Sequence, residues 1–393
     1  MPSDAQSRTE SALRDYARHV CDVGVRAGLH RVGIAPAQRF DRARRAIEDR
    51  NARGLSDTMQ FTFRNPARST DPSVSVRGAR SIIVGAVAYH EPTPQRPQLG
   101  SSSPTARVAR YAWRDHYGTL RSALGAVADE LKSVGHRAVV VADENALVDR
   151  EAAYLAGLGW YGKNANLLLV DVGSWFVLGG VVTDAVLPTS SPVADGCGSC
   201  RRCLDGCPTG AIIEPGVIDA ARCLAWVIQK PGIVDRNLRE VIGDRIYGCD
   251  DCQEVCPPST RSVRVSTPGL RSDEHPDNTP AGGPDHEVDP VAVMAMSDTE
   301  IMARFGRWYI HDREPRWVRR NALVVLGNTA RPNDASARGA IARGLADTDP
   351  YVRAHAVWAA ARVGHVDLLP ADPDSEPSEV VRAELRHLPT PRG

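Results

Sequence analysis

Eight of the nine cysteines in this chain lie in one stretch, between Cys197 and Cys256. The first four form a tight run, Cys197, Cys200, Cys203 and Cys207, which Pro208 follows. Three more form a second run, Cys249, Cys252 and Cys256, which Pro257 follows, and Cys223 stands alone between the runs. The eight thiols can be divided into two sets of four with none left over, so this stretch is expected to fold around two four-ligand centres.

The spacing within the runs indicates what these centres hold. The first run is C-x2-C-x2-C-x3-C-P, the pattern of bacterial ferredoxins with two 4Fe-4S clusters, in which the fourth cysteine ligates the other cluster. The second run is one cysteine short, and Cys223 supplies it. This crossover assigns one cluster to Cys197, Cys200, Cys203 and Cys256, and the other to Cys207, Cys223, Cys249 and Cys252. Because paired clusters carry single electrons, the chain is expected to be redox-active.

Two other interpretations of the cysteines stay open. Four thiolates also suit structural zinc, and C-x2-C pairs are common in zinc sites. Disulfides are the second alternative, although a chain of this length without a secretion signal has little need of them. The x3-Cys-Pro ending of both runs favours iron-sulfur clusters.

Composition limits the cellular setting of the chain. The 393 residues carry 48 basic and 48 acidic side chains, so any basic surface must be local. The first ten residues lack the apolar core of a secretion signal, and the longest uncharged stretch, Val172 to Thr183, is well short of the ~20 residues that span a bilayer. A cytoplasmic protein without a membrane partner is therefore expected.

The first 190 residues alternate between helical and strand-like patterns. Apolar spacing predicts helices over residues 8–28 and 120–134, and strands over 30–35, 81–88 and 137–142. Two further apolar runs, 166–170 and 176–183, flank a Gly-containing segment and predict a hairpin. Residues 1–190 are therefore predicted to form one mixed α+β domain.

The rest of the chain divides into three segments. Residues 191–260 are predicted to form a small two-cluster module, and 261–290, rich in Pro, Ser, Asp and Gly, a flexible linker. In 291–393, the segments that begin at Val318 and Val352 resemble each other and lie 34 residues apart, as expected for helical repeats. Their arginines, Arg319, Arg320 and Arg353, are expected on a surface that contacts a partner.

A glycine-rich segment, Gly157-Leu-Gly-Trp-Tyr-Gly-Lys-Asn164, matches the dinucleotide fingerprint and nearly matches a phosphate-binding loop. Both motifs need a strand before the glycines and a helix after them. Here a helix is predicted over 149–158 and a strand near Asn166, the reverse order. The glycines are therefore interpreted as a helix C-cap turn that packs closely against its surroundings.

Three aspartates are candidates for a site. Asp143 ends a predicted buried strand, a position from which a side chain projects into a crevice, and a desolvated carboxyl there could donate a proton near neutral pH. The alternative is a turn aspartate that satisfies backbone amides. Asp250 and Asp251 lie between cluster ligands and are expected to point away from the anionic clusters, toward a ligand or a structural partner.

Taken together, these motifs resemble the epoxyqueuosine reductase family. The resemblance is carried by Gly243 to Pro257, by the first cysteine run with Pro208-Thr-Gly-Ala-Ile212, by Ala156 to Asn164 and by Arg107 to Trp113. It runs from about residue 10 to 365. It implies cobalamin beside two 4Fe-4S clusters, a cobalamin-binding α+β domain at 1–190, a ferredoxin-like module at 191–260 and C-terminal HEAT-like repeats.

The resemblance also implies roles for individual residues. Asp143 occupies the position of the family's proton donor. Corrin contacts are implied at Arg110, Asp143, Lys163, Leu167, Leu178, Val181, Asp250 and Asp251. The implied activity is reduction of epoxyqueuosine to queuosine at the tRNA wobble position, with tRNA held by the C-terminal repeats, an external one-electron donor and a monomeric enzyme.

Two other functions remain as alternatives. Residues 144–146, 256–259 and 307–311 depart from the family pattern, which motivates a related reductase that acts on another epoxide or a halogenated substrate. A non-enzymatic electron carrier is the other alternative, but it leaves the large N-terminal domain unexplained.

Overall fold

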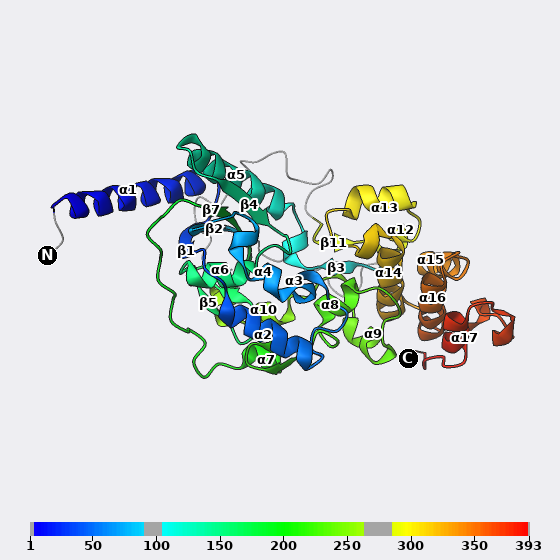
Figure 1. The fold of residues 1–393 in the computed structure, drawn as a ribbon. Coiled ribbons are helices and arrows are strands. Elements are labelled where there is room, and N and C mark those ends of the chain that lie inside the picture. The colour runs from blue at the N-terminus through cyan, green and yellow to red at the C-terminus, as the bar shows by residue number, and fades with distance from the viewer. Residues whose placement is uncertain (1–3, 90–103, 263–284, 392–393) are drawn as a thin grey trace. The chain divides into compact units, whose positions relative to one another are not determined.

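The computed structural model describes residues 4–89, 104–262 and 285–391 (Figure 1). The chain forms two compact units. Unit one comprises the described residues of 1–92, 115–221 and 251–278, and unit two those of 93–114, 222–250 and 279–393. The cysteine segment 191–260 is divided between the two units, since its middle part, 222–250, belongs to unit two.

A four-stranded antiparallel sheet forms the centre of unit one. Its strands are ordered β1 (Arg31–Pro36), β2 (Ser81–Ala88), β7 (Phe176–Thr183) and β4 (Ala138–Ala142). Helices α5 (His116–Ser133) and α1 (Asp4–Arg26) lie on one side, and α6 (Asp149–Leu155) packs against strands of the same sheet from the other (Figure 1). Helices cover both faces, and β2 and β7 accordingly read as continuous apolar runs.

Glycines allow α5 to lie close to the sheet. Gly85 of β2 and Gly179 of β7 are directly paired. A Cβ atom on Gly85 would lie 2.6 Å from Leu29, and one on Gly179 would lie 2.8 Å from Leu124 and 2.9 Å from the Cβ of Ala142. At these distances the neighbouring groups would have to shift, so the two glycines let Leu29, and Leu124 of α5, pack directly on the sheet.

Shorter elements complete unit one. Strand β5 (Trp160–Tyr161) pairs with β6 (Leu167–Leu168), and β8 (Ile212–Glu214) pairs with β9 (Val217–Ile218). The remaining helices are α2 (Asp41–Ala52), α3 (Phe61–Arg64), α4 (Pro66–Ser69), η1 (Pro72–Val74), α7 (Arg202–Asp205), α10 (Asp251–Glu254) and α11 (Pro257–Ser262).

Unit two joins a small sheet to a series of helices. Strand β3 (Ala106–Val108) lies between β10 (Arg245–Tyr247), which is parallel to it, and β11 (Glu287–Val288), which is antiparallel. Helices α14 (Arg316–Thr329), α15 (Ala335–Leu345), α16 (Pro350–Val363) and α17 (Glu379–Leu385) follow one another and pack in sequence. The other helices are η2 (Arg110–Ala112), α8 (Leu224–Gln229), α9 (Arg236–Ile242), α12 (Pro290–Val293), α13 (Asp298–Phe305), η5 (His311–Arg313), η6 (Val366–Leu368) and η7 (Pro373–Ser375).

The structure confirms the α+β class and the long elements predicted for the first 190 residues, but not the hairpin. Strand β6 pairs with β5, and β7 pairs with β2 and β4, so the two runs do not pair with each other. A single bridge joins Leu169 of the first run to Gly173, which lies in the segment between the runs. Most of the predicted linker 261–290 lies outside the described residues, and its ends are regular elements, α11 and β11. Among the residues that the structure describes, no helix is long and apolar enough to cross a membrane.

Candidate iron-sulfur centre and active site

The four cysteines assigned to the first cluster lie together in unit one. Cys203 on α7 and Cys256, just after α10, are both more than nine-tenths buried. Burial raises the pKa of the Cys203 thiol to about 11, and the charges of Cys256, Cys197 and Cys200 add to the rise. Cys256 and Cys197 pack in one side-chain cluster around Trp160, so these two thiols lie close together. As thiolates they would repel one another unless a cationic centre were bound among them.

Trp160 of β5 provides an independent test of this fit. It packs against Cys256 and Cys197, and a Cβ atom on Gly196 would lie 2.7 Å from its ring. Its indole Nε1–H is buried and has no hydrogen-bond acceptor among the described residues. A buried donor without a partner is costly, and the sulfur atoms of a cluster held by Cys197 and Cys256 would offer acceptors next to it. The residues present therefore fit a cluster.

Lys163, a predicted corrin contact, is engaged elsewhere. Its Nζ donates to the carbonyl oxygens of Gly198 at 2.7 Å and Cys200 at 2.9 Å. The ammonium therefore fixes the loop that carries Cys197 and Cys200, and so has a structural role at the first cluster.

The cysteines assigned to the second cluster are described within each unit separately. In unit one, the Cys207 sulfur accepts a hydrogen bond from the backbone N–H of Ala211 at 3.2 Å, and Cys252 lies on α10. In unit two, Cys223 is the N-cap residue of α8, and Cys249 lies two residues beyond β10. Each cysteine lies in or next to a regular element, and the assignment of these four to one cluster stays a prediction.

Asp250 and Arg110, two further predicted corrin contacts, are tied to each other within unit two. The Asp250 carboxylate accepts the backbone N–H of Arg110 at 2.8 Å, and both residues are more than nine-tenths buried. The guanidinium of Arg110 lies over the ring of Trp113. Asp250 therefore acts as a structural partner of the β3–η2 connection, which was one of the two roles expected for it. Asp251 is the first residue of α10 in unit one and is half-buried.

Asp143 follows β4 and has an unusual backbone. Its φ is +58°, in the left-handed region that few residues other than Gly, Asn and Asp adopt. The carboxylate keeps 56% of its surface exposed and lies 3.6 Å from the Arg121 guanidinium on α5. Partial desolvation by the surrounding protein raises the pKa of Asp143, Arg121 opposes the rise, and Asp149 and Glu144 add to it. The side chain is therefore accessible to a substrate or cofactor and holds its proton more readily than an ordinary aspartate.

The predicted corrin contacts in the sheet cannot act together through their side chains. Leu178 packs with the α6 side of the sheet. Val181 lies three residues further along β7, so its side chain points to the opposite face. Leu167, Leu178 and Val181 are each at most 5% exposed. Of the eight predicted positions, Asp143 is the one whose exposed carboxylate fits contact with a bound cofactor.

Two features of the site were not predicted. Glu151 of α6 is almost fully buried, and it accepts hydrogen bonds from Tyr161 at 3.0 Å and from both ends of the Arg42 guanidinium. This contact ties the glycine-rich turn to α6. Residues 157–159 do form the predicted C-cap turn, with φ of +69° at Gly157. No sequence signal marks Glu151 as buried.

The second unpredicted feature is Ser259, just beyond the second cysteine run. Its Oγ accepts the backbone N–H of Ser174 at 3.1 Å, and its carbonyl oxygen accepts the indole N–H of Trp175 at 3.1 Å. A Cβ atom on Gly173 would lie 2.4 Å from Ser259. The Gly-Ser-Trp segment, whose glycine suggested a hairpin turn, instead packs against Ser259 of α11 and hydrogen-bonds to it.

The arrangement defines a class of protein: a two-cluster iron-sulfur protein with a helix-covered sheet and C-terminal helical repeats. Family models agree with each part. The model "Epoxyqueuosine reductase QueG, DUF1730" matches residues 69–149, the "4Fe-4S double cluster binding domain" matches 196–259 and "HEAT repeats" matches 307–386.

Comparison with known proteins identifies the family. The chain is 32% identical over 372 residues to the epoxyqueuosine reductase of Xanthomonas campestris, covering 92% of this chain and 97% of that protein. Two solved structures of epoxyqueuosine reductases are 27% identical and cover 97% of this chain. The first, from Bacillus subtilis, has its catalytic aspartate loop swung out of the active site, with a TM-score of 0.81 and 98% of that chain covered. The second contains an epoxyqueuosine-modified stem loop of tyrosine tRNA, with a TM-score of 0.82 and 97% of that chain covered.

The chain belongs to the epoxyqueuosine reductase family. Its cofactors are two 4Fe-4S clusters, and cobalamin is consistent with the family.

Proposed function

We propose that this chain reduces epoxyqueuosine to queuosine in tRNA and that Asp143 donates a proton to the departing epoxide oxygen. The observation that carries the second part is the exposed carboxylate of Asp143, with its raised pKa, on a loop at the end of β4. The Bacillus subtilis relative has a catalytic aspartate on a loop. Asp143 is the matching candidate in this chain.

The reaction sets what the protein must supply. Removal of the epoxide oxygen as water takes two electrons and two protons, and both carbon–oxygen bonds break. Two bound clusters would supply the electrons one at a time, and a bound cobalamin would supply the chemistry that passes them to the epoxide. The protein must therefore hold the tRNA nucleoside in place, exclude water and protonate an oxygen that gains negative charge as its bonds break.

Asp143 meets the last requirement. A carboxyl with a raised pKa is protonated in a larger share of molecules at neutral pH, and a carboxylic acid placed at the oxygen lowers the barrier to its departure. Arg121, at 3.6 Å, limits the rise in the pKa, so the proton is not held too tightly to be given up. The left-handed backbone conformation of Asp143 fixes the direction in which its side chain points at the end of β4.

The electron path follows from the cysteine pattern. We assign one cluster to Cys197, Cys200, Cys203 and Cys256, supported by the crossover pattern and by the packing of Cys197 and Cys256 against Trp160. We assign the other cluster to Cys207, Cys223, Cys249 and Cys252, supported by the crossover pattern. Each turnover needs two single-electron deliveries, so an external one-electron donor is required. We place the reaction in the cytoplasm, where the tRNA substrate is modified.

The structure of one relative contains an epoxyqueuosine-modified tRNA stem loop, and in this chain we place the nucleic acid on unit two. Tyr309 is 38% exposed, and its hydroxyl lies 3.4 Å from the His311 Nδ1. An exposed aromatic ring can stack on an unpaired base. The expectation that three arginines face a partner is wrong. Arg320 is fully buried. The side chains of Arg319 and Arg353 are at most 16% exposed, and each is paired with an acidic residue.

The test of this proposal is the Asp143→Asn variant. Asparagine has the same size and tolerates the left-handed backbone, so the loop keeps its shape and loses its acid. We expect both clusters to be retained and the conversion of epoxyqueuosine in tRNA, followed by mass spectrometry as the loss of one oxygen atom, to slow by about 10²-fold or more.

Asp57→Asn is the matched control, because Asp57 also has a positive φ, +50°, in the same unit. It should convert tRNA at the wild-type rate. Full activity of Asp143→Asn would remove the assigned role of Asp143. No conversion by wild-type protein with complete clusters and cobalamin would refute the proposed substrate.

A further inference from the structure

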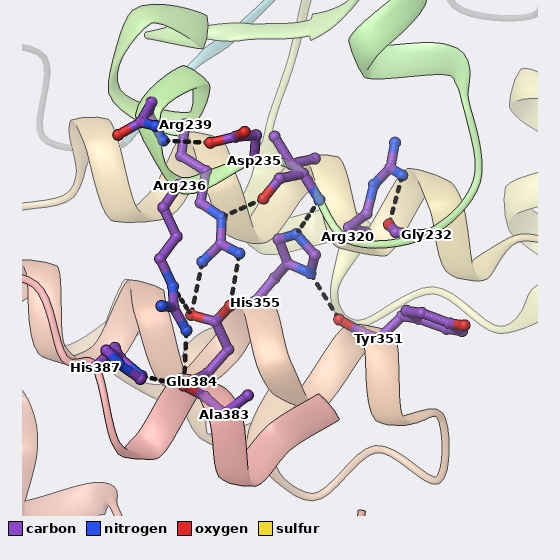
Figure 2. A network of polar contacts seen from close by, with 12 residues as sticks. Gly232, Asp235, Arg236, Arg239, Arg320, Tyr351, His355, Ala383, Glu384 and His387 are labelled. Atoms are coloured by element: carbon purple, nitrogen blue, oxygen red, sulfur yellow. Dashed lines mark hydrogen bonds and ion pairs between the residues drawn. The ribbon is translucent and has the colours of Figure 1, made fainter. Parts of the chain in front are cut away.

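Helix α14 carries two adjacent polar side chains in the interior of unit two. Arg320 is fully buried and Asn321 is 7% exposed. The Arg320 guanidinium donates to the carbonyl oxygens of Ile228 at 2.7 Å, Lys230 at 2.6 Å and Gly232 at 3.0 Å. Figure 2 shows Arg320 reaching the Gly232 carbonyl. The side chain therefore caps the C-terminal end of α8, where carbonyl groups have no partner within the helix.

Asn321 joins two segments that are distant in sequence. Its Nδ2 donates to the carbonyl oxygen of Ile228 in α8 at 3.0 Å and to that of Ile246 in β10 at 3.1 Å. Its Oδ1 accepts from the Arg320 Nε at 3.1 Å, which fixes the orientation of the amide. One amide group thus links the last turn of α8 to β10.

The two linked segments are those that carry Cys223 and Cys249. Cys223 is the N-cap residue of α8, and Ile228 lies in the last turn of this six-residue helix. Cys249 lies three residues beyond Ile246. The separation of these two cysteines therefore depends on the link between α8 and β10.

The energetics favour a positioning role over simple stabilisation. Each hydrogen bond that we find for the Arg320 guanidinium goes to a carbonyl or amide oxygen rather than to a carboxylate. Burial, with a smaller effect from the charge of Arg239, lowers the pKa of Arg320 to about 9. A buried cation held in this way is expensive, and an apolar side chain of similar volume would stabilise the interior at least as well. An apolar side chain has no hydrogen-bond donors, so it cannot hold three carbonyl groups in fixed places.

We propose that Arg320 and Asn321 are positioning residues for the second 4Fe-4S cluster, because they set the separation of Cys223 from Cys249. This inference rests on the proposed assignment of these two cysteines to one cluster. It gives the first helical repeat a function in electron transfer. Reduction potentials respond to ligand geometry and to hydrogen bonds at sulfur. The link between α8 and β10 therefore affects the reduction potential of the second cluster as well as the positions of its ligands.

The Asn321→Asp variant separates positioning from stability. Aspartate keeps the oxygen that faces Arg320 and adds a charge opposite the buried cation, so the fold is preserved. It loses the donor to Ile228 and Ile246 and repels their carbonyl oxygens. Asn321→Leu is the second variant, since it removes the donor without adding a charge.

Asn328→Leu is the matched control. Asn328 lies on the same helix, and its Nδ2 makes the same kind of double contact, to the carbonyl oxygens of Arg239 at 2.7 Å and Gly243 at 3.0 Å. These carbonyls are further along the chain from both cysteines. Iron content and the electron paramagnetic resonance spectra of the two reduced clusters are measured for each purified protein, together with a redox titration.

We expect Asn321→Asp and Asn321→Leu to shift the potential of one cluster or to lose about half of the iron, with the signal of the other cluster unchanged. Asn328→Leu should keep both signals. Wild-type signals in both Asn321 variants, or equal loss of both clusters, would overturn the inference while leaving the proposed function standing. The assignment itself is tested by Cys223→Ala and Cys249→Ala, which should each remove the same cluster; two intact clusters in either would refute it.

Discussion

The buried ion pair between Arg239 and Glu384 should make unit two sensitive to the loss of one partner. Glu384 is 4% exposed and accepts both terminal nitrogens of Arg239, at 3.0 and 2.8 Å, while Arg239 itself is fully buried (Figure 2). Arg236 donates to the same carboxylate at 3.2 Å. Replacement of Glu384 by Gln leaves the Arg239 charge in the interior without its carboxylate.

The expected cost follows from that geometry. Removal of one partner of a buried pair costs about 3 to 5 kcal/mol, because the remaining charge is not solvated. In Glu384→Gln the charge of Arg320 adds to the penalty, since Arg320 and Arg239 repel each other. The amide oxygen of glutamine recovers one hydrogen bond, which places the expected loss near 3 kcal/mol. For a unit of this size the loss lowers the melting temperature by roughly 10 °C.

Intrinsic fluorescence is a suitable assay, because five of the seven tryptophans lie in unit two. The double variant Arg239→Met with Glu384→Leu should recover most of the loss, since an apolar pair replaces the ionic one. Glu379→Gln, on the same helix and paired with Arg382 at the surface, should change the free energy of unfolding by less than about 1 kcal/mol. The reasoning is refuted if Glu384→Gln behaves like Glu379→Gln, or if the double variant is no more stable than Glu384→Gln.

Two further outcomes are expected. Arg121→Gln removes a positive charge that lowers the pKa of Asp143, so the pKa of Asp143 should rise and the loss of activity at high pH should move to higher pH. Lys132→Gln, on the same helix, should leave the pH profile of activity unchanged. An unchanged pH profile in Arg121→Gln would count against Asp143 as the proton donor. Trp160→Phe removes the buried indole N–H beside Cys197 and Cys256. The reduction potential of the first cluster should become more negative by roughly 20 to 60 mV, which corresponds to the loss of one hydrogen bond to sulfur. An unchanged potential in a redox titration would show that this N–H does not face the cluster.

The sequence predicted what depends on local pattern. Apolar runs identified β2 and β7, because strands covered on both faces need apolar residues throughout. The division of the cysteines between two clusters stays a prediction. The hairpin prediction failed because the glycine between the two runs is used for contact with Ser259, which is distant in sequence. No local pattern contains that contact.

The same limit explains the wrong expectation for Arg320. Helical periodicity identified α14, but it could not show that Arg320 meets the carbonyl end of another helix rather than solvent. The opposite orientation of Leu178 and Val181 becomes evident only when the strand pairing and the covering helices are known, and their contact with a corrin stays a prediction. The role of Asp143 also stays a prediction, and the sequence could not show its neighbour Arg121, because Arg121 comes from a different element.

Gly179 connects the interior of the sheet to the acidity of Asp143. A methyl group at this position would press on Leu124, one turn from Arg121 on α5, and on Ala142, the residue before Asp143. An added methyl group would therefore act on both elements that hold the Arg121 guanidinium 3.6 Å from the Asp143 carboxylate. We expect Gly179→Ala to change the pKa of Asp143 through that distance, and a shifted pH profile of activity would show the change.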